Sequence, residues 1–156
     1  MTRLRVAAPS DAELVASHRE RMFSDMGRDA ASLAPMTLAF VPWVRAALAR
    51  GAYLGFIAEE DGVAIGGAGL MILDWPPHPL DAQPLRGYVL NVYVAPHHRG
   101  RGVARTLMTR IVDEARSRGV RVVTLNASDA GRAMYERLGF EATNEMRLLV
   151  PREASA

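Results

Sequence analysis

The stretch from Leu90 to Met108 joins an apolar, β-branched strand to a helix through a loop of glycine and arginine. The strand pattern ends at Pro96, Gly100 and Gly102 lie in the loop, and a helical pattern begins directly after Gly102. The first backbone N–H groups of a helix have no partner within it, and the positive end of the helix dipole lies at the same point. Glycine also lets a ligand approach the main chain closely. The stretch therefore predicts a strand–loop–helix unit that binds phosphate, whereas its simpler interpretation is a turn in which glycine only makes the bend.

Two other classes of glycine-rich loop do not fit these residues. A dinucleotide-binding loop begins with Gly100-x-Gly102, but its third glycine falls on Arg105. The carboxylate expected roughly 20 residues further on is also missing, because the chain there reads Arg-Val-Val-Thr-Leu. A Walker-type loop requires Gly-Lys-Ser/Thr, and the chain contains no lysine.

Two segments in a fixed order carry a more specific likeness. The first reads Arg99-x-x-Gly102-x-Ala104 after a strand that ends in Val-x-Pro. The second runs from Ala133 to Phe140 and reads Ala-Met-Tyr-Glu-Arg-Leu-Gly-Phe. Together they resemble the GCN5-related N-acetyltransferase (GNAT) superfamily, whose signature (Gln/Arg)-x-x-Gly-x-(Gly/Ala) precedes a similar tyrosine-containing segment. The resemblance covers roughly residues 50–149, and the first 50 residues are compatible with it.

The resemblance implies an α/β (α+β) GNAT fold in a single N-acetyltransferase domain over residues 1–156. Such a fold has a mixed, mostly antiparallel sheet of six or seven strands, a central splayed parallel pair and flanking helices. The residue patterns favour the matching order β-α-α-β-β-β-α-β-α-β. Strands are expected at residues 4–7, 53–59, 63–73, 87–95 and 121–125, with one or two more within 140–149, and helices at residues 10–27, 42–50, 103–116 and 129–138.

Several local signals set the ends of these elements. Ser10 is the expected N-cap of the first helix, since Glu13 follows at the spacing of a capping box. Pro35 and Pro42 are expected to interrupt the helical region of residues 28–50. Asp-Gly at residues 61–62 predicts a hairpin turn.

The resemblance also implies acetyl-coenzyme A as cofactor. The backbone N–H groups of residues 99–104 suit its pyrophosphate, and nearby arginines can reach the outer phosphates. The pantetheine amides resemble a peptide and could pair with the edge of the central strand, where Asn91, polar among apolar residues, indicates a splay or a bulge. The expected cofactor-binding residues are Val92, Tyr93, Val94, Arg99, Gly100, Arg101, Gly102, Val103, Ala104, Arg105, Asn126 and Ala133.

Transfer of an acetyl group requires a proton for the departing thiolate and a neutral amine to attack. By resemblance, Tyr135 is the acid. Some family members carry a glutamate in the central strand, but residues 87–95 contain no carboxylate. Asp74 and His78, in a proline-rich loop, are therefore the candidates for easing amine deprotonation, although the same loop can be a rigid surface turn. His18, alone on a helix, is more typical of a structural residue than of a substrate contact.

Composition narrows the partners. The formal charge of +2 indicates no particular class of binding partner. The absence of cysteine excludes a thiol nucleophile and a disulfide framework. The N-terminal residues lack the apolar core of a signal peptide, so we expect a cytoplasmic protein with no membrane, nucleic-acid or metal partner. The expected acceptor is a small-molecule amine or a peptide, and a homodimer is left open. The alternatives are an acyl-coenzyme A sensor without turnover and, more remotely, a nucleic-acid binder.

Overall fold

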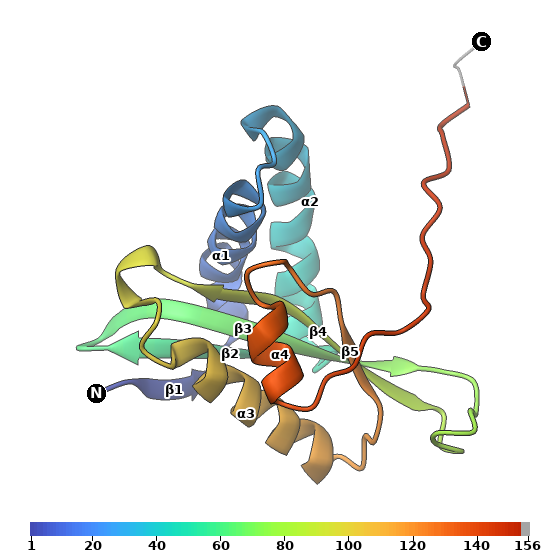
Figure 1. Cartoon of the computed structure of the whole chain (residues 1–156). Coiled ribbons are helices and arrows are strands. Elements are labelled where there is room, and N and C mark those ends of the chain that lie inside the picture. The colour runs from blue at the N-terminus through green and yellow to red at the C-terminus, as the bar shows by residue number, and fades with distance from the viewer. Residues whose placement is uncertain (154–156) are drawn as a thin grey trace.

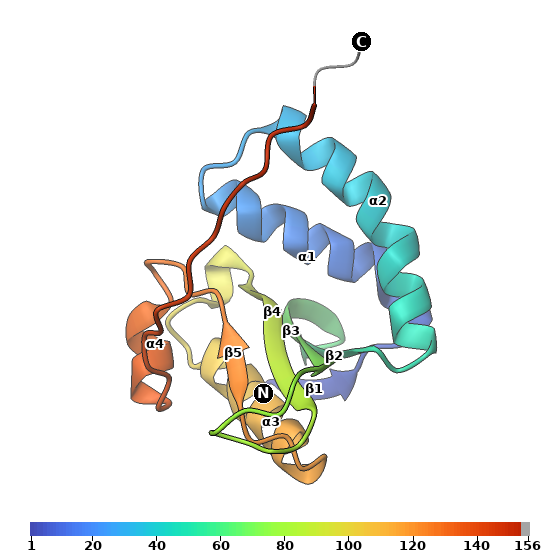
Figure 2. The ribbon, with the colours of Figure 1, turned by 90° about the vertical axis from the view of Figure 1, so that its right-hand side faces the viewer.

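The computed structural model describes residues 1–153. The elements, in chain order, are β1 (Arg3–Val6), η1 (Pro9–Asp11), α1 (Ala12–Asp25), α2 (Ala30–Ala49), β2 (Tyr53–Glu60), β3 (Val63–Asp74), β4 (Leu85–Val94), η2 (Pro96–His98), α3 (Val103–Ser117), β5 (Val123–Leu125) and α4 (Arg132–Arg137). One sheet in the order β1-β2-β3-β4-β5 lies between two helical layers (Figures 1 and 2). The helices α1 and α2 cover one face, and α3 covers the other with α4 beside it.

The strand pairing confirms a mixed, mostly antiparallel sheet. The first four strands pair antiparallel to one another, and β5 runs parallel to β4. The β2–β3 turn consists of Asp61 and Gly62 with φ values of 50° and 76°, as the Asp-Gly signal predicts. The sheet has five strands among the described residues rather than six or seven. As a result, the parallel pair lies at its edge.

The main core lies between the sheet and α3. The apolar stripe of α3 is buried, and it packs against Phe56, Leu70 and Val89 of three neighbouring strands. Each large apolar side chain buried in this way stabilises the folded state by roughly 1.5–3 kcal/mol. The packing fixes the first turn of α3 beside the end of β4. The stripe comprises Val103, Leu107, Met108, Ile111 and Ala115.

The start of α1 differs from the prediction. Ser10 is not the N-cap; it lies within the short turn η1, and α1 follows Asp11. The Asp11 carboxylate accepts the backbone N–H of Ala8 at 2.8 Å and is held by the Arg5 guanidinium at 2.8 and 2.9 Å. Hydrogen bonds from Arg5 lower the pKa of Asp11 below its usual value. Asp11 thus ties the turn before α1 to Arg5 of β1, six residues earlier.

The helix α2 is continuous through both prolines, so the predicted interruption is wrong. Pro35 and Pro42 lie inside Ala30–Ala49. Each proline removes one helical N–H donor, but the apolar side of α2 packs on α1 and β2 and holds the helix together. By length and mean hydropathy (1.3) α2 could also cross a membrane, a test that core helices of soluble proteins pass as well.

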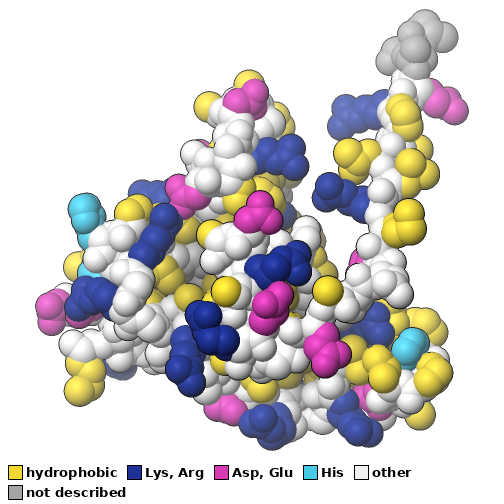
Figure 3. Space-filling view, viewed as in Figure 1, with side chains coloured by type: hydrophobic (Ala, Val, Ile, Leu, Met, Phe, Trp, Pro, Cys, Tyr) yellow, Lys and Arg dark blue, Asp and Glu magenta, His cyan; other side chains and the backbone are white. Residues whose placement is uncertain are grey.

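The expected closing strands within residues 140–149 are not formed. After Gly139, which has a φ of 99°, the chain leaves the body of the protein as an extended segment (Figures 1 and 3). Residues 141–153 are all exposed. A strand requires a neighbour to pair with its backbone, and this segment has none among the described residues. That the chain forms a single domain stays a prediction.

Candidate functional site

The turn between η2 and α3 has the geometry of an anion site. Gly100 and Gly102 adopt left-handed φ values of 74° and 80°, and no atom lies within 4 Å of a Cβ built on either. Gly102 is the N-cap of α3 and has no side chain to accept the first N–H groups. The first turn of α3 also carries no acidic residue. The free N–H groups and the positive end of the helix dipole therefore favour a bound anion.

The three arginines around this turn differ in how they are held. Arg99 donates to the Val94 carbonyl at 2.8 Å and pairs with Asp25 at 2.6 Å. Arg101 lies 3.4 Å from Glu60. Arg105 is exposed and forms no ion pair with the described residues, so it can reach a ligand phosphate without first leaving a partner. It borders an open hollow of about 360 Å³ along α3, together with Thr106 and Thr109 among others.

The strand β4 has an unpaired edge where the parallel pair splays. Its pairing with β5 ends at Val89, opposite Leu125, yet β4 continues to Val94. The register with β3 shifts beside Asn91, whose φ of 59° is unusual for a residue other than glycine. This confirms the bulge that the polar residue indicated. Residues 90–94, which include Val92 and Tyr93, thus have no strand partner on the β5 side among the described residues.

Tyr135 lies on α4 within the main core. Its side chain is buried, with its ring 5.9 Å from that of Phe140. Burial raises the pKa of Tyr135, so the phenol stays protonated at neutral pH and has a proton to donate. Asn126 directly follows β5, Ala133 lies in the first turn of α4, and both are exposed.

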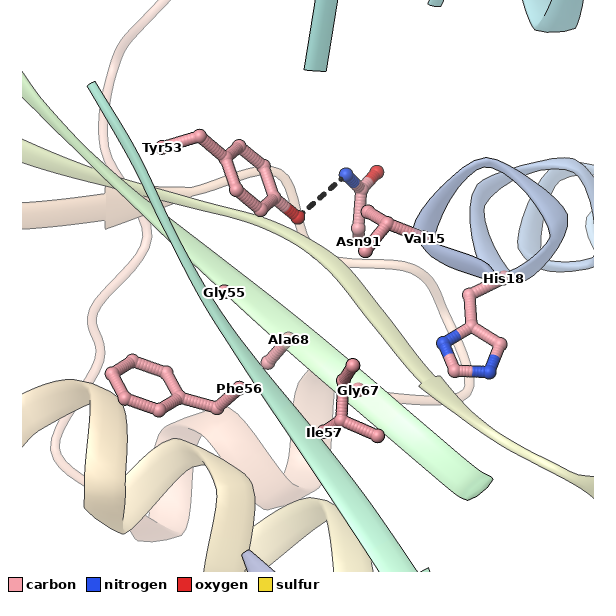
Figure 4. Close-up of a pocket in the computed structure, with 9 residues that line it drawn as sticks. All are labelled: Val15, His18, Tyr53, Gly55, Phe56, Ile57, Gly67, Ala68 and Asn91. Atoms are coloured by element: carbon pink, nitrogen blue, oxygen red, sulfur yellow. Dashed lines mark hydrogen bonds between the residues drawn. The ribbon is translucent and has the colours of Figure 1, made fainter. Parts of the chain in front are cut away.

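A buried polar network lies on the opposite face of β4 (Figure 4). Asn91 donates to the Tyr53 hydroxyl at 2.9 Å and accepts from the Arg19 guanidinium at 2.7 Å. Burial raises the pKa of Tyr53 to about 12. His18 stacks on Tyr93 with 5.1 Å between ring centroids, and burial lowers its pKa to about 4. The cavity between these groups, about 10 Å³, is too small for a substrate.

Arg19 is a residue that sequence reasoning missed. It lies four residues after Val15 and four before Phe23 on α1, a helical spacing that indicates a position on the inner face. Its guanidinium lies between the rings of Phe23 and Phe40, 4.9 and 5.0 Å from their centroids. Burial lowers the pKa of Arg19. Its Nε is buried without a hydrogen-bond partner, and it forms no ion pair within residues 1–153.

The structure does not bring Asp74 and His78 to this region. Asp74 pairs with Leu85, six residues before Asn91 along β4, a length of roughly 20 Å for an extended strand. His78 forms an isolated bridge with Asp81 in an exposed loop. In Figure 1 this loop and the Gly100–Gly102 turn lie at opposite ends of the sheet. The catalytic role of both residues stays a prediction.

Known proteins are similar to this chain in sequence and in structure. The sequence profile of the "Acetyltransferase (GNAT) family" matches residues 17–140. A GCN5-related N-acetyltransferase from Ralstonia eutropha is 42% identical, with a TM-score of 0.93 over 96% of this chain and 99% of that one. A protein from Clostridium acetobutylicum, described as a predicted acetyltransferase with acetyl-CoA, is 31% identical, with a TM-score of 0.89 over 96% of each chain.

Curated relatives match a smaller part of the chain. The L-amino acid N-acyltransferase MnaT of Escherichia coli is 31% identical over 68% of this chain. The glucosamine 6-phosphate N-acetyltransferase of Trypanosoma brucei brucei is 33% identical over 60% of it. These matches span 60% and 62% of the lengths of the two relatives.

Proposed function

The chain belongs to the GNAT family of acetyltransferases, and from this premise we propose that it transfers an acetyl group from acetyl-coenzyme A to a primary amine. The observation that carries the proposal is the continuity of two backbone features. The unpaired edge of β4 leads directly into the turn at Gly102 and the N-terminus of α3. A strand edge suits the amides of pantetheine, and a free helix N-terminus suits a pyrophosphate. One extended cofactor can use both.

The cofactor contacts follow from this arrangement. Residues 92–94 would pair with the pantetheine amides, and the N–H groups of residues 102–105 would hold the pyrophosphate. Arg105 would reach an outer phosphate, since it has no competing ion pair among the described residues. Arg99 is held by Val94 and Asp25, which fits a residue that shapes the turn.

The chemistry requires one bond to form and one to break. The neutral amine attacks the thioester carbon, the new C–N bond forms and the C–S bond breaks. The thiolate takes a proton from the Tyr135 hydroxyl, and the proton that the amine loses restores that hydroxyl, so that an amide and a free thiol result. What supports this role is the position of Tyr135 in the family-like segment from Ala133 to Phe140. A backbone N–H near Asn91 would stabilise charge on the carbonyl oxygen.

For the acceptor we propose an amine that carries a nearby anionic group. Arg19 bonds to Asn91 and is partly desolvated between Phe23 and Phe40. A partly buried cation without a counter-charge is costly, and a carboxylate or phosphate on the acceptor would supply that charge. Two relatives are named for anionic acceptors, an L-amino acid and glucosamine 6-phosphate. The free face of the Arg19 guanidinium is where such a group would bind.

Thiol release from acetyl-coenzyme A tests both the activity and the acceptor class. The panel consists of matched pairs: L-methionine with its decarboxylated amine, and glucosamine 6-phosphate with glucosamine. We expect turnover of at least one anionic member, with kcat/KM at least about 10-fold above that of its neutral partner, as one charge-assisted contact implies. Arg19→Gln should reduce this preference and leave the Kd for acetyl-coenzyme A unchanged. Equal turnover of both members of each pair would overturn the acceptor class.

The same assay decides between an enzyme and a sensor. Acetyl-coenzyme A binding without thiol release on any amine would favour a non-catalytic module. If transfer occurs, Asp74→Asn and His78→Asn test the predicted base, since loss of the base should change the pH profile of kcat/KM. A cytoplasmic location and the absence of nucleic-acid and membrane partners stay predictions.

A further inference from the structure

Two buried arginine nitrogens lack a hydrogen-bond partner within residues 1–153. They are the Nε atoms of Arg19 on α1 and of Arg86 on β4, and the only other buried side-chain atom of this kind there is an oxygen of Asp81. Neither arginine forms an ion pair with another described residue. A buried donor without a partner is unfavourable, so both guanidinium groups are suited to bind an anion that the chain itself does not supply.

The two arginines lie on the same face of the sheet. Arg86 and Tyr88 are two residues apart on β4, so their side chains share a face. Tyr88 pairs with Met71, which packs against the apolar cluster between α1, α2 and the sheet. Burial lowers the pKa of Arg19, and the nearby phenols of Tyr53 and Tyr88 offset part of this shift. One guanidinium therefore lies near Tyr88, and a second follows two residues along the strand.

Aromatic rings hold both guanidinium groups in place. Arg86 lies over the ring of Trp75, 4.4 Å from its centroid. Arg19 lies between the rings of Phe23 and Phe40 in the same way. Stacking occupies the flat face of a guanidinium and leaves its N–H edge free for a planar carboxylate. Both groups are thus positioned in advance for anions.

The carboxylates close to Arg86 in sequence do not neutralise it. Asp74 pairs with the β4 residue that precedes Arg86, so it lies on the opposite face. Asp81 accepts from Gln83, whose amide donates to the carbonyl of Gly119 just after α3. The helix α3 covers that opposite face. The counter-charge for Arg86 must therefore come from outside the described residues.

We propose that the acceptor amine carries two anionic groups and that Arg86 binds the second. The first lies beside the amine and binds Arg19, so this inference rests on the proposed acceptor site and deepens it. Arg86 and Tyr88 are separated by roughly 7 Å along the strand, a span that the two carboxylates of one small molecule can cover. An amino acid with an acidic side chain has this chemistry.

The binding of reaction products tests the Arg86 subsite without requiring turnover. The ligands are the N-acetyl derivatives of L-aspartate, L-glutamate and L-α-aminoadipate, each compared with its side-chain amide by titration calorimetry in the presence of coenzyme A. We expect at least one acid to bind about 10-fold or more tightly than its amide, as one charge-assisted contact implies. If no acid binds more tightly than its amide, the proposal is overturned, whether or not the chain transfers acetyl groups.

Substitutions then show whether Arg86 causes the preference. Arg86→Gln should abolish it, and Arg86→Lys, which keeps the charge, should retain part of it. Arg19→Gln should weaken acid and amide alike, because both carry the first carboxylate. Arg3→Gln is the control for net charge, since Arg3 is exposed on β1, and it should leave the preference unchanged. A preference that survives Arg86→Gln would refute the subsite.

Thiol release with L-glutamate and L-glutamine separates this inference from the proposed function. Turnover of both at the same kcat/KM, with no acid preferred in the binding assay, would leave the activity standing and refute the role of Arg86. Preferred binding of an acid that Arg86→Gln abolishes, without thiol release on any amine, would establish the subsite and refute the activity.

Discussion

Replacing Gly102 by alanine separates the cost of backbone strain from the loss of cofactor binding. Gly102 has a φ of 80°, and a Cβ there meets no protein atom within 4 Å. The substitution should therefore lower the free energy of unfolding by only about 1–2 kcal/mol, which is the cost of a left-handed alanine. At about 2–4 °C per kcal/mol for a chain of this size, the thermal midpoint should fall by about 2–8 °C.

The substitution should weaken the binding of acetyl-coenzyme A by more than it lowers the stability of the fold. The added methyl group enters the open space beside the turn, where the pyrophosphate is proposed to approach the backbone. Loss of one charge-assisted hydrogen bond costs about 1.5–3 kcal/mol, so the Kd should rise on the order of 10- to 100-fold. Titration calorimetry with acetyl-coenzyme A measures it directly.

Gly51 provides a matched control for this experiment. It follows α2 with a φ of 74°, and a Cβ there also meets nothing within 4 Å. Gly51→Ala should lower the thermal midpoint by a similar amount and leave the Kd unchanged. If both variants bind acetyl-coenzyme A with the affinity of the wild type, the anion site at Gly102 is refuted.

Three further predictions concern other parts of the molecule. Tyr135→Phe keeps the ring and removes the proton, so kcat should fall on the order of 10- to 1000-fold with an unchanged Kd for the cofactor; a full-rate variant would remove Tyr135 from the mechanism. Because burial lowers the pKa of His18 to about 4, the unfolded chain binds more protons between pH 6.5 and 4, and the free energy of unfolding should fall as the pH drops through this range, by up to about 1.4 kcal/mol per pH unit. His18→Phe should flatten that slope in denaturant titrations. Gly69→Ala places a Cβ 2.1 Å from the Tyr53 hydroxyl and should destabilise the chain by about 1–3 kcal/mol, and an unchanged urea midpoint would contradict that packing.

Elements defined by local pattern could be predicted from the sequence. The stripe of α3 repeats at helical spacing, and the β2–β3 hairpin has its Asp-Gly turn, so both appear where expected. The glycines at 100 and 102 have the left-handed conformations that an anion turn needs. In each case the determinant lies within a few residues in sequence.

Features that depend on distant contacts could not be predicted. Pro35 and Pro42 signal a break, yet packing against α1 and β2 keeps α2 whole. Arg19 has the helical spacing of a residue on the inner face of α1, but its contact with Asn91, 72 residues away, could not be predicted from that spacing. The expected closing strand forms no pairing within residues 1–153, although its apolar residues suggest a strand in the sequence.

Asn91 links the two sides of the proposed site. Its left-handed backbone costs about 1 kcal/mol or more, and two side-chain hydrogen bonds, to Tyr53 and from Arg19, offset that cost. The bulge in turn lies where β4 separates from β5 and frees the edge proposed for pantetheine. The residue that shapes the cofactor edge therefore also positions the arginine proposed to bind the acceptor. A change at Asn91 should affect both substrates at once, whereas a change at Arg19, which leaves the hydrogen bond from Asn91 to Tyr53 in place, should affect mainly the acceptor.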